Sequence, residues 1–242
     1  MAPVTHVCWK WHSPTYRVRF TPQHVNVWAA MIRRHHKAPC RLVCITDEPA
    51  GIKIETFPIW KDHERIGNPS GGVLPSCYRR LRIFDGETTR ALGIEDGDRV
   101  VSWDLDVVVL GDVVPLFDRP DEFVGWKGIA AYGQPVYNGS LFMHRAGSLQ
   151  WIWDTFDPIE SPKATKGAKY YGSDQAWLSY CFKGSRPGCD VQDGVYSFAR
   201  DCYRPRAEPA ENARVVFFNG KRKPWEHFTQ LTTPWISRHW RA

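Results

Sequence analysis

The chain has 242 residues, of which 43% are hydrophobic, and it carries a formal net charge of +6 with a pI of about 9.0. This length suits one large domain or two small ones, and the apolar fraction is sufficient for a hydrophobic core. No apolar run reaches the roughly 18 residues of a transmembrane helix, and the first residues, MAPVTHVCWKWH, lack the apolar segment of a signal peptide. The modest basic excess favours anionic partners such as nucleotide phosphates, nucleic acid or anionic glycans, without by itself indicating a nucleic-acid-binding protein.

Strands and helices alternate along the chain, with no repeats and no convincing linker, which predicts one α/β domain with a mixed, mostly parallel sheet over residues 1–242. The predicted strands are 4–9, 41–46, 53–57, 99–103, one near Phe123, one from Tyr137, and 214–218. The predicted helices are 21–36, 76–84, 148–156 and 173–182, with Thr21 and Ser173 as caps. Residues 60–75 are expected to form a loop over a site, and 162–169 an irregular segment.

The seven cysteines form no CxxC pair and show no zinc-like spacing. We interpret them as reduced thiols, mostly small buried hydrophobes, in a cytoplasmic protein.

Two aspartates, Asp104 and Asp106, interrupt the apolar run VVSWDLDVVVLGDVVPLF at the expected end of a buried strand. Strand periodicity directs both carboxylates to the same side, and ligands of open α/β sheets bind at the carboxyl ends of strands. Oxygen ligands at this spacing suit Mn²⁺ or Mg²⁺ with phosphates completing the shell. The alternative is that one aspartate caps a turn while the other pairs with an arginine. A second such pair, Asp96 and Asp98 beside Gly97, is interpreted as a turn.

The string DLDVVV also fits the DxDx[TV][LV] motif of haloacid-dehalogenase phosphatases, in which Asp104 would be the nucleophile and Asp106 a general acid. That site needs a later lysine and a downstream acidic pair, and the nearest candidate, GSDQAW, lacks the second acid. The motif also follows two or three strands rather than the first one. The phosphatase is therefore the weaker alternative.

The order of several motifs resembles a known family more closely. These motifs are VCWKWHSPTY, RLVCITDEPAGI, CYRRLRIFD, the DLD run, YNGSLFM, GSDQAWLS and FFNGKRKPW. From Val4 to Trp225 the chain resembles GT-A glycosyltransferases, in particular the glycogenin-like and lipooligosaccharide-galactosyltransferase group (family 8-like) and its small bacterial and phage relatives. The resemblance implies a nucleotide-binding half at about 1–117 and an acceptor-side half at about 118–242.

The resemblance also implies roles at the donor phosphates. Asp104 and Asp106 would hold a divalent ion between the two phosphates of a nucleotide-sugar, UDP-sugar being favoured. Arg79, Arg82 and Lys223 would stabilise the same diphosphate, with Arg79 as first choice, or the arginines would form a solvated face. In the late motif, Gly220 opens a loop whose N–H groups can contact phosphate. The family's metal-ligating His is missing there, because Phe217 and Asn219 stand at its usual positions, and only Asn219 can ligate.

At the base end, the resemblance places Trp9, Lys10, Trp11 and Tyr16 in the first strand and loop, and Asp47 at the end of the second strand. Aromatic side chains there can stack on a base, although core packing explains Trp9 equally well. Asp47 would accept a hydrogen bond from base or ribose, or it caps a turn.

Sugar-binding roles are implied for Asn138, Gly139 and Ser140, where Gly139 would allow close approach of the sugar. Asp174 and Gln175 would lie near the reacting carbon as the catalytic pair. The alternative is that Asp174 only stabilises the N-terminus of its helix, where the helix dipole favours a carboxylate.

The conclusion from the sequence is a metal-dependent glycosyltransferase that moves a sugar from a nucleotide-diphosphate sugar to a hydroxyl. The resemblance alone implies retention at the anomeric carbon; an inverting enzyme would use Asp174 as base. The acceptor is open and includes a glycan, a protein, a small molecule and a hydroxymethylated DNA base. Lys163, Lys166 and Lys169 suggest an anionic acceptor or simply a solvated loop. A basic binding protein on a degenerate GT-A fold is the non-enzymatic alternative.

Overall fold

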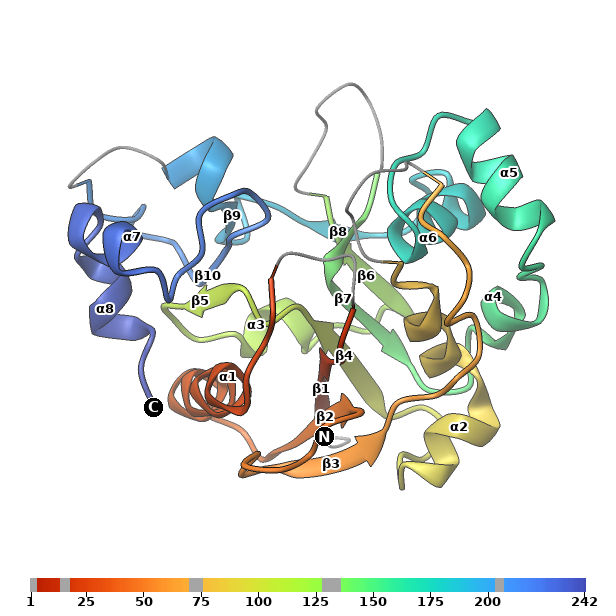
Figure 1. The fold of residues 1–242 in the computed structure, drawn as a ribbon, viewed down its shortest axis with the longest axis horizontal. Helices are drawn as coiled ribbons and strands as arrows, with labels where there is room; N and C mark the ends of the chain where they lie inside the picture. Colours follow the sequence, from red (N-terminus) through yellow and green to blue (C-terminus); the bar gives the residue numbers. More distant parts are fainter. Residues whose placement is uncertain (1–3, 14–17, 70–75, 128–135, 203–206) are drawn as a thin grey trace.

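The computed structural model describes residues 4–13, 18–69, 76–127, 136–202 and 207–242 (Figure 1). Its main sheet has seven strands in the order β3-β2-β1-β4-β7-β6-β8. Their bounds, in that order, are Glu55–Pro58, Cys40–Thr46, Val4–Lys10, Arg99–Trp103, Asn138–Arg145, Phe123–Trp126 and Gly188–Cys189. The first four strands are parallel, β7 runs antiparallel to both β4 and β6, and β8 is parallel to β6. The predicted mixed, mostly parallel sheet is therefore confirmed.

A second sheet lies beside the first and has three strands in the order β5-β10-β9. Their bounds are Val107–Val109, Val215–Phe217 and Val195–Ser197. The sequence predicted β10 but neither of its neighbours, because strands of three residues carry almost no periodic signal. The connection from the large sheet to the small one is the segment Asp104–Asp106, which follows β4 and precedes β5.

Helices cover both faces of the large sheet. In chain order, the α-helices are α1 (Pro22–His35), α2 (Gly86–Ala91), α3 (Val114–Phe117), α4 (Gln150–Asp154), α5 (Glu160–Gly167), α6 (Asp174–Phe182), α7 (His227–Thr232) and α8 (Trp235–His239). A 3₁₀ helix, η1 (Tyr78–Phe84), and a π-helical turn, η2 (Phe198–Cys202), complete the set. In the described part of the chain, none of these helices has the length and apolarity needed to cross a bilayer.

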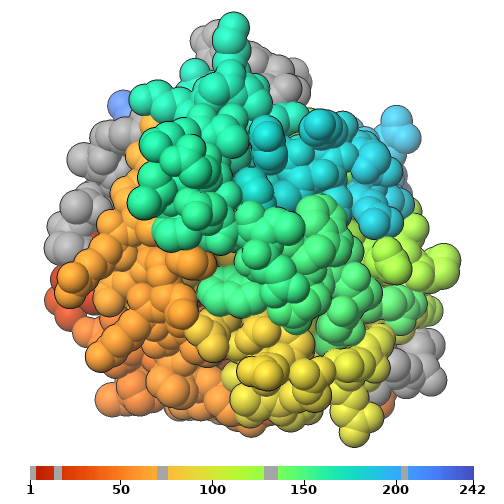
Figure 2. Space-filling view, turned by 90° about the vertical axis from the view of Figure 1, so that its right-hand side faces the viewer, coloured from red at the N-terminus to blue at the C-terminus, as the bar shows by residue number. Residues whose placement is uncertain are grey.

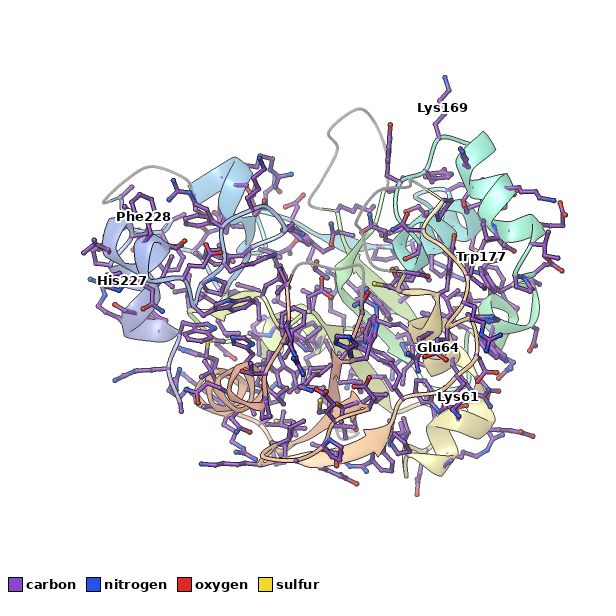
Figure 3. The ribbon with its side chains drawn as sticks, viewed as in Figure 1. Lys61, Glu64, Lys169, Trp177, His227 and Phe228 are labelled. Carbon is purple, nitrogen blue, oxygen red and sulfur yellow. The ribbon has the colours of Figure 1, made fainter. Side chains whose placement is uncertain are left out.

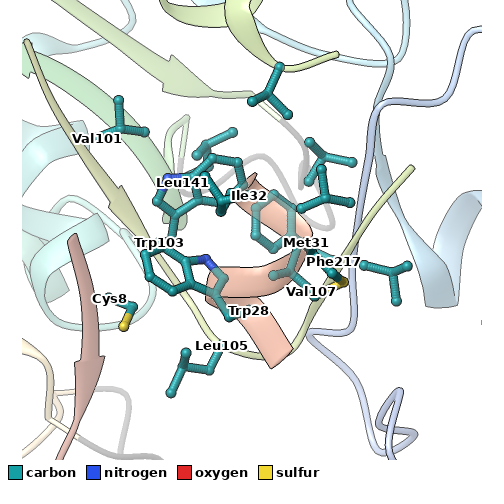
Figure 4. Close-up of a cluster of buried hydrophobic side chains, with 14 of the residues drawn as sticks. Cys8, Trp28, Met31, Ile32, Val101, Trp103, Leu105, Val107, Leu141 and Phe217 are labelled. Carbon is teal, nitrogen blue, oxygen red and sulfur yellow. The ribbon is translucent and has the colours of Figure 1, made fainter. Parts of the chain in front are cut away.

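Two hydrophobic clusters show that the sheet is buried on both faces. On one face, Trp28 of α1 packs with Trp103 of β4 and with Phe217 of the small sheet (Figure 4). On the other face, Val7 and Ile45 pack against Tyr78 of η1 and the helices α4 and α6. Figure 2 shows the outside of that second layer, where α4, α5, α2 and the segment around residues 50–66 form the surface. Burial on both faces explains the near-continuous apolar strands.

The helix predicted at 21–36 is confirmed as α1, with Thr21 as its N-cap and Pro22 at its start. The prediction of an irregular segment at 162–169 is wrong, because α5 spans Glu160–Gly167. Lys169, at φ 62°, follows this helix in a left-handed conformation. The pair Asp96 and Asp98 lies in a turn, as expected, around Gly97 at φ 91°.

Candidate functional site

The two aspartates of the DLD segment lie where the sequence places them, directly after β4 at the carboxyl end of the parallel strands. Both line a pocket at this edge of the sheet. Its other lining residues are Trp9, Trp11, Ser13, Val18, Phe20, Cys77, Arg80 and Leu105. Asp106 is 7% exposed, whereas the Asp104 side chain keeps about a third of its surface. Buried carboxylates need partners, and each aspartate has its own.

Asp104 is held by two donors from different elements. The Arg80 Nη1 group of η1 donates to its Oδ1 at 2.6 Å, and the Ser140 hydroxyl of β7 donates to its Oδ2 at 2.6 Å. The backbone N–H of Asp104 donates to the Ser140 carbonyl at 2.9 Å, which fixes the end of β4 against β7. Asp104 is therefore a fixed, charged acceptor on the pocket wall.

Arg80 connects three parts of this site. Its Nε donates to Asp174 Oδ2 at 2.7 Å, and its Nη2 donates to the Gly139 carbonyl at 3.0 Å, in addition to the bond to Asp104. Burial alone would lower the pKa of this guanidinium, but the carboxylates of Asp174 and Asp104 raise it above its ordinary value. The side chain is 4% exposed, so Arg80 is a permanently charged clamp between the DLD segment and the start of α6.

The sequence reasoning missed Arg80 and preferred Arg79 and Arg82. Arg79 donates to the Trp60 carbonyl at 2.7 Å and pairs with Glu64, and Arg82 pairs with Asp62 at 2.6 Å. These two arginines do share a side, but that side of the 3₁₀ helix faces the segment 60–64 and not the aspartates. The structure thus does not bring Arg79 or Arg82 to the DLD segment, and their role at a diphosphate stays a prediction.

The second aspartate pairs with the late basic motif. The Lys223 ammonium donates to Asp106 Oδ2 and to the Phe218 carbonyl, the latter at 2.8 Å. Burial raises the pKa of the Asp106 carboxyl, while the Lys223 ammonium acts in the opposite direction. Both side chains are almost fully enclosed, at 9% and 3% exposure. Of the alternative interpretation, the pairing of one aspartate with an arginine is present at Asp104, whereas Asp106 pairs with a lysine instead of capping a turn.

Asn219 lies close to the same group, because its Nδ2 is 3.3 Å from the Ser140 hydroxyl that binds Asp104. Phe217 faces the core, where its ring stacks on Trp126 with centroids 4.8 Å apart. Gly220 follows in the loop after β10. Of the two positions considered for the missing histidine, only Asn219 brings a polar side chain to the hydroxyl group that binds Asp104.

The NGS motif opens β7, as predicted. Its residues make their contacts with other groups of the protein. The Asn138 Oδ1 accepts from the backbone N–H of Ser140 at 2.8 Å. A Cβ on Gly139 would lie 2.7 Å from Arg80 Nη2 and 3.2 Å from Asp174 Oδ2. The absence of a side chain at Gly139 thus makes room for the Arg80–Asp174 pair, whereas a sugar contact stays a prediction.

We expect Gly139→Ala to destabilise the protein by about 1–3 kcal/mol, because the new methyl group forces the Arg80–Asp174 pair apart in a packed interior. Urea denaturation measures the loss. Gly67→Ala is the matched control, since a Cβ there meets no atom of the described residues within 4 Å. Equal stability of the two variants would contradict the close packing around Gly139.

Asp174 and Gln175 begin α6 beside the NGS motif. Asp174 is 3% exposed, burial raises the pKa of its carboxyl, and Arg80 opposes that shift. The Gln175 Oε1 accepts from the Gly139 N–H at 3.2 Å, and its Nε2 donates to the Tyr171 carbonyl at 3.0 Å. A carboxylate held by an arginine in this way suits an orienting role better than that of a free base.

Among the residues expected to bind the nucleobase, Trp9 is 3% exposed, and its indole N–H donates to Ser102 at 2.8 Å. These contacts favour the interpretation that Trp9 packs in the core. Lys10 is buried and binds Glu48 at 2.7 Å. Trp11 is half-buried on the pocket wall. Asp47 accepts from the N–H of His12 at 2.9 Å. Tyr16 lies outside the described residues.

A group of His6, His36 and Cys40 brings three potential ligand atoms within 4.8 Å of one another. The Trp103 indole N–H donates to His6 Nδ1 at 3.0 Å, which leaves the ring proton on Nε2, where it faces His36 Nδ1 at 3.1 Å. A metal-binding histidine instead directs its second N–H at an acceptor. His6 and His36 therefore form a hydrogen-bond chain that holds Trp103, the residue immediately before Asp104.

No protein-family model and no curated protein sequence matches the chain. Several solved structures, however, are similar to the chain in fold. The galactosyltransferase LgtC, in complex with donor and acceptor sugar analogues, superposes with a TM-score of 0.60 at 16% identity, over 97% of this chain and 94% of LgtC. An active-site Gln-to-Glu variant of LgtC gives a TM-score of 0.59 at 16% identity, over 97% of this chain and 93% of the variant.

The apo form of the glycosyltransferase GlyE of Streptococcus pneumoniae TIGR4 gives a TM-score of 0.57 at 13% identity, over 93% of this chain. The match spans 57% of GlyE, so this chain corresponds to a part of that protein. The fold of this chain is therefore the GT-A glycosyltransferase fold of these solved structures. In particular, it is similar to that of the galactosyltransferase LgtC over nearly the whole of both chains.

Proposed function

We propose that the protein is a glycosyltransferase that moves a sugar from a nucleoside-diphosphate sugar, UDP-sugar being favoured, to a hydroxyl acceptor. The observation that carries this proposal is a pocket at the carboxyl edge of a GT-A sheet that is lined by Asp104, Asp106 and Arg80, with Lys223 bonded to Asp106 behind it. Two cations beside two carboxylates form a site for a group that brings both negative charge and a metal ion, as a diphosphate does.

The donor atoms near the pocket fit a hard divalent ion. Asp104 and Asp106 offer carboxylate oxygens, and Asn219, whose amide nitrogen donates to the Ser140 hydroxyl at 3.3 Å, also carries an amide oxygen. Oxygen ligands of this kind suit Mn²⁺ or Mg²⁺ with phosphates and water completing the shell. Such an ion, held by these residues, would neutralise charge on the departing diphosphate. Asp174 would orient Arg80, and the departing phosphate would take the acceptor proton in a retaining reaction.

A thermal-shift screen of nucleotide-sugars with and without Mn²⁺, followed by turnover in Mn²⁺ and in EDTA, tests this function. A donor that raises the melting temperature binds the folded state preferentially. Release of phosphate from monoesters without sugar transfer would support the phosphatase alternative. Nucleotide-sugar binding without turnover would support the binding protein.

We predict that Asn219→His strengthens Mn²⁺ binding by about tenfold, because a neutral imidazole is a good ligand for this ion. Isothermal titration with Mn²⁺ measures the change, and Asn212→His, at an exposed residue of another segment, is the control. Unchanged Mn²⁺ affinity together with loss of nucleotide binding would assign Asn219 to the phosphate or the sugar instead.

An anionic acceptor, DNA included, is proposed on weaker grounds. Lys163 and Lys166 lie on α5, and Lys163 pairs with Glu160 at the surface, 67% exposed. Lys169 extends outward beyond the end of this helix (Figure 3). If these lysines bind phosphates, replacing all three with alanine should flatten the salt dependence of acceptor binding. DNA that shows no salt-dependent retention at low ionic strength leaves a glycan or a protein as the acceptor.

A further inference from the structure

The ammonium of Lys223 supplies a positive charge to the DLD segment from within the protein. It is bonded to Asp106 Oδ2 and to the Phe218 carbonyl, and its side chain is 3% exposed. A charge-assisted hydrogen bond between two enclosed groups persists only while both remain paired. Asp106, one of the two carboxylates proposed for a divalent ion, is therefore already paired with a cationic side chain, as Asp104 is with Arg80.

The backbone that carries Lys223 is fixed on both sides. The Phe218 N–H donates to the Asp106 carbonyl at 2.8 Å, and the Lys223 N–H donates to Glu226 Oε2 at 2.9 Å. Trp225 packs on His24 of α1 with ring centroids 4.2 Å apart. The part of Lys223 that can exchange partners without moving the loop is thus its ammonium, on a flexible four-carbon stem.

The charges of the pocket connect that exchange with ligand binding. Three carboxylates, Asp104, Asp106 and Asp174, face two cations, Arg80 and Lys223. A divalent ion shared by Asp104 and Asp106 would meet the Lys223 ammonium at the same carboxylate, and like charges repel strongly where water is scarce. A diphosphate adds negative charge and offers the ammonium a second partner.

We propose that Lys223 is a tethered competitor of the divalent ion at Asp106, and that the donor diphosphate attracts the ammonium away and so opens the carboxylate to the ion. This inference rests on the proposed function and adds a coupling between its two ligands. Because such coupling is reciprocal, ion and nucleotide raise each other's affinity by the same factor. The free protein holds the ion weakly.

The direct test is Mn²⁺ binding to the full chain without nucleotide, followed by the electron paramagnetic resonance signal of free Mn²⁺. Lys223→Met removes the competing charge and should bind Mn²⁺ at least about tenfold more tightly than the wild type. Lys223→Arg keeps the charge and should stay weak. Lys221→Met, exposed in the same loop, is the matched control and should differ from the wild type by less than about twofold.

Equal or weaker Mn²⁺ binding by Lys223→Met overturns the inference. If that variant does not fold, Lys223→Gln replaces it, because its amide can still donate to Asp106 and to the Phe218 carbonyl. A second titration, with UDP as the probe, should show coupling of at least about tenfold in the wild type and a much smaller factor in Lys223→Met. Equal coupling in the two proteins also overturns it.

Failure of the inference and failure of the proposed function give different results. If no variant binds Mn²⁺ and the wild type transfers sugar in EDTA, the competition is refuted and the transferase stands. If Lys223→Met binds Mn²⁺ tightly but no nucleotide-sugar binds under any condition, the competition at Asp106 stands and the proposed transferase is refuted.

Discussion

Asp106→Asn is expected to lower the rate of sugar transfer by about a thousandfold. The amide cannot supply the negative charge that an ion bound at the diphosphate requires, and charge stabilisation of several kcal/mol corresponds to a loss of this size. The same change leaves the Lys223 ammonium, 3% exposed, without its counterion. We therefore also expect the free energy of unfolding to fall by about 3 kcal/mol.

The two effects are separated by measuring turnover and urea denaturation on the same samples. The double variant Asp106→Asn/Lys223→Gln removes both charges and should recover part of the stability without recovering activity. Asp98→Asn is the matched control, because Asp98 lies in the surface turn around Gly97 and should change neither quantity noticeably. Near-normal turnover of Asp106→Asn would refute the role of the DLD segment in catalysis.

Arg80→Met is expected to be the most destabilising single substitution in the site. It leaves the buried Asp174, and on the pocket wall Asp104, without the cation that both now share, at a cost of about 3–5 kcal/mol. Arg82→Met is the control, since that side chain is 30% exposed and its pair with Asp62 lies at the surface. We expect less than about 1 kcal/mol there.

Urea denaturation of both arginine variants gives the comparison. Asp174→Asn in the Arg80→Met background should restore stability. This second substitution removes the more deeply buried of the two carboxylates that have lost their cation. Similar midpoints for Arg80→Met and Arg82→Met would show that the Arg80 cluster does not stabilise the fold.

Local patterns predicted the large sheet well. The apolar run before DLD indicated a strand buried on both faces, and β4 is that strand. The cap and proline at the start of α1 were equally clear. The small sheet was not predictable in the same way, because β5 and β9 have three residues each and are defined by pairing with β10 rather than by their own pattern.

The ligands of each aspartate were harder to predict than the aspartates themselves. Arg80 and Asp174 are separated by 94 residues, and Asp106 and Lys223 by 117, so no local spacing reports either pair. The choice of Arg79 and Arg82 assumed that a face shared on a helix is the face that points to the site. The 3₁₀ geometry of η1 directs Arg80 there instead.

The position of DLD between two sheets has a consequence for the order in which the molecule assembles. Closing the site requires β10 to pair with β5 across more than a hundred residues of chain, and long-range contacts of this kind form late in folding. A form with the large sheet intact and β10 detached would retain most of its helices and strands yet have Lys223 and Asn219 far from Asp106. On gentle heating we therefore expect ligand binding to disappear before the bulk of the secondary structure, with backbone amides of 215–218 exchanging ahead of those in β1 and β4.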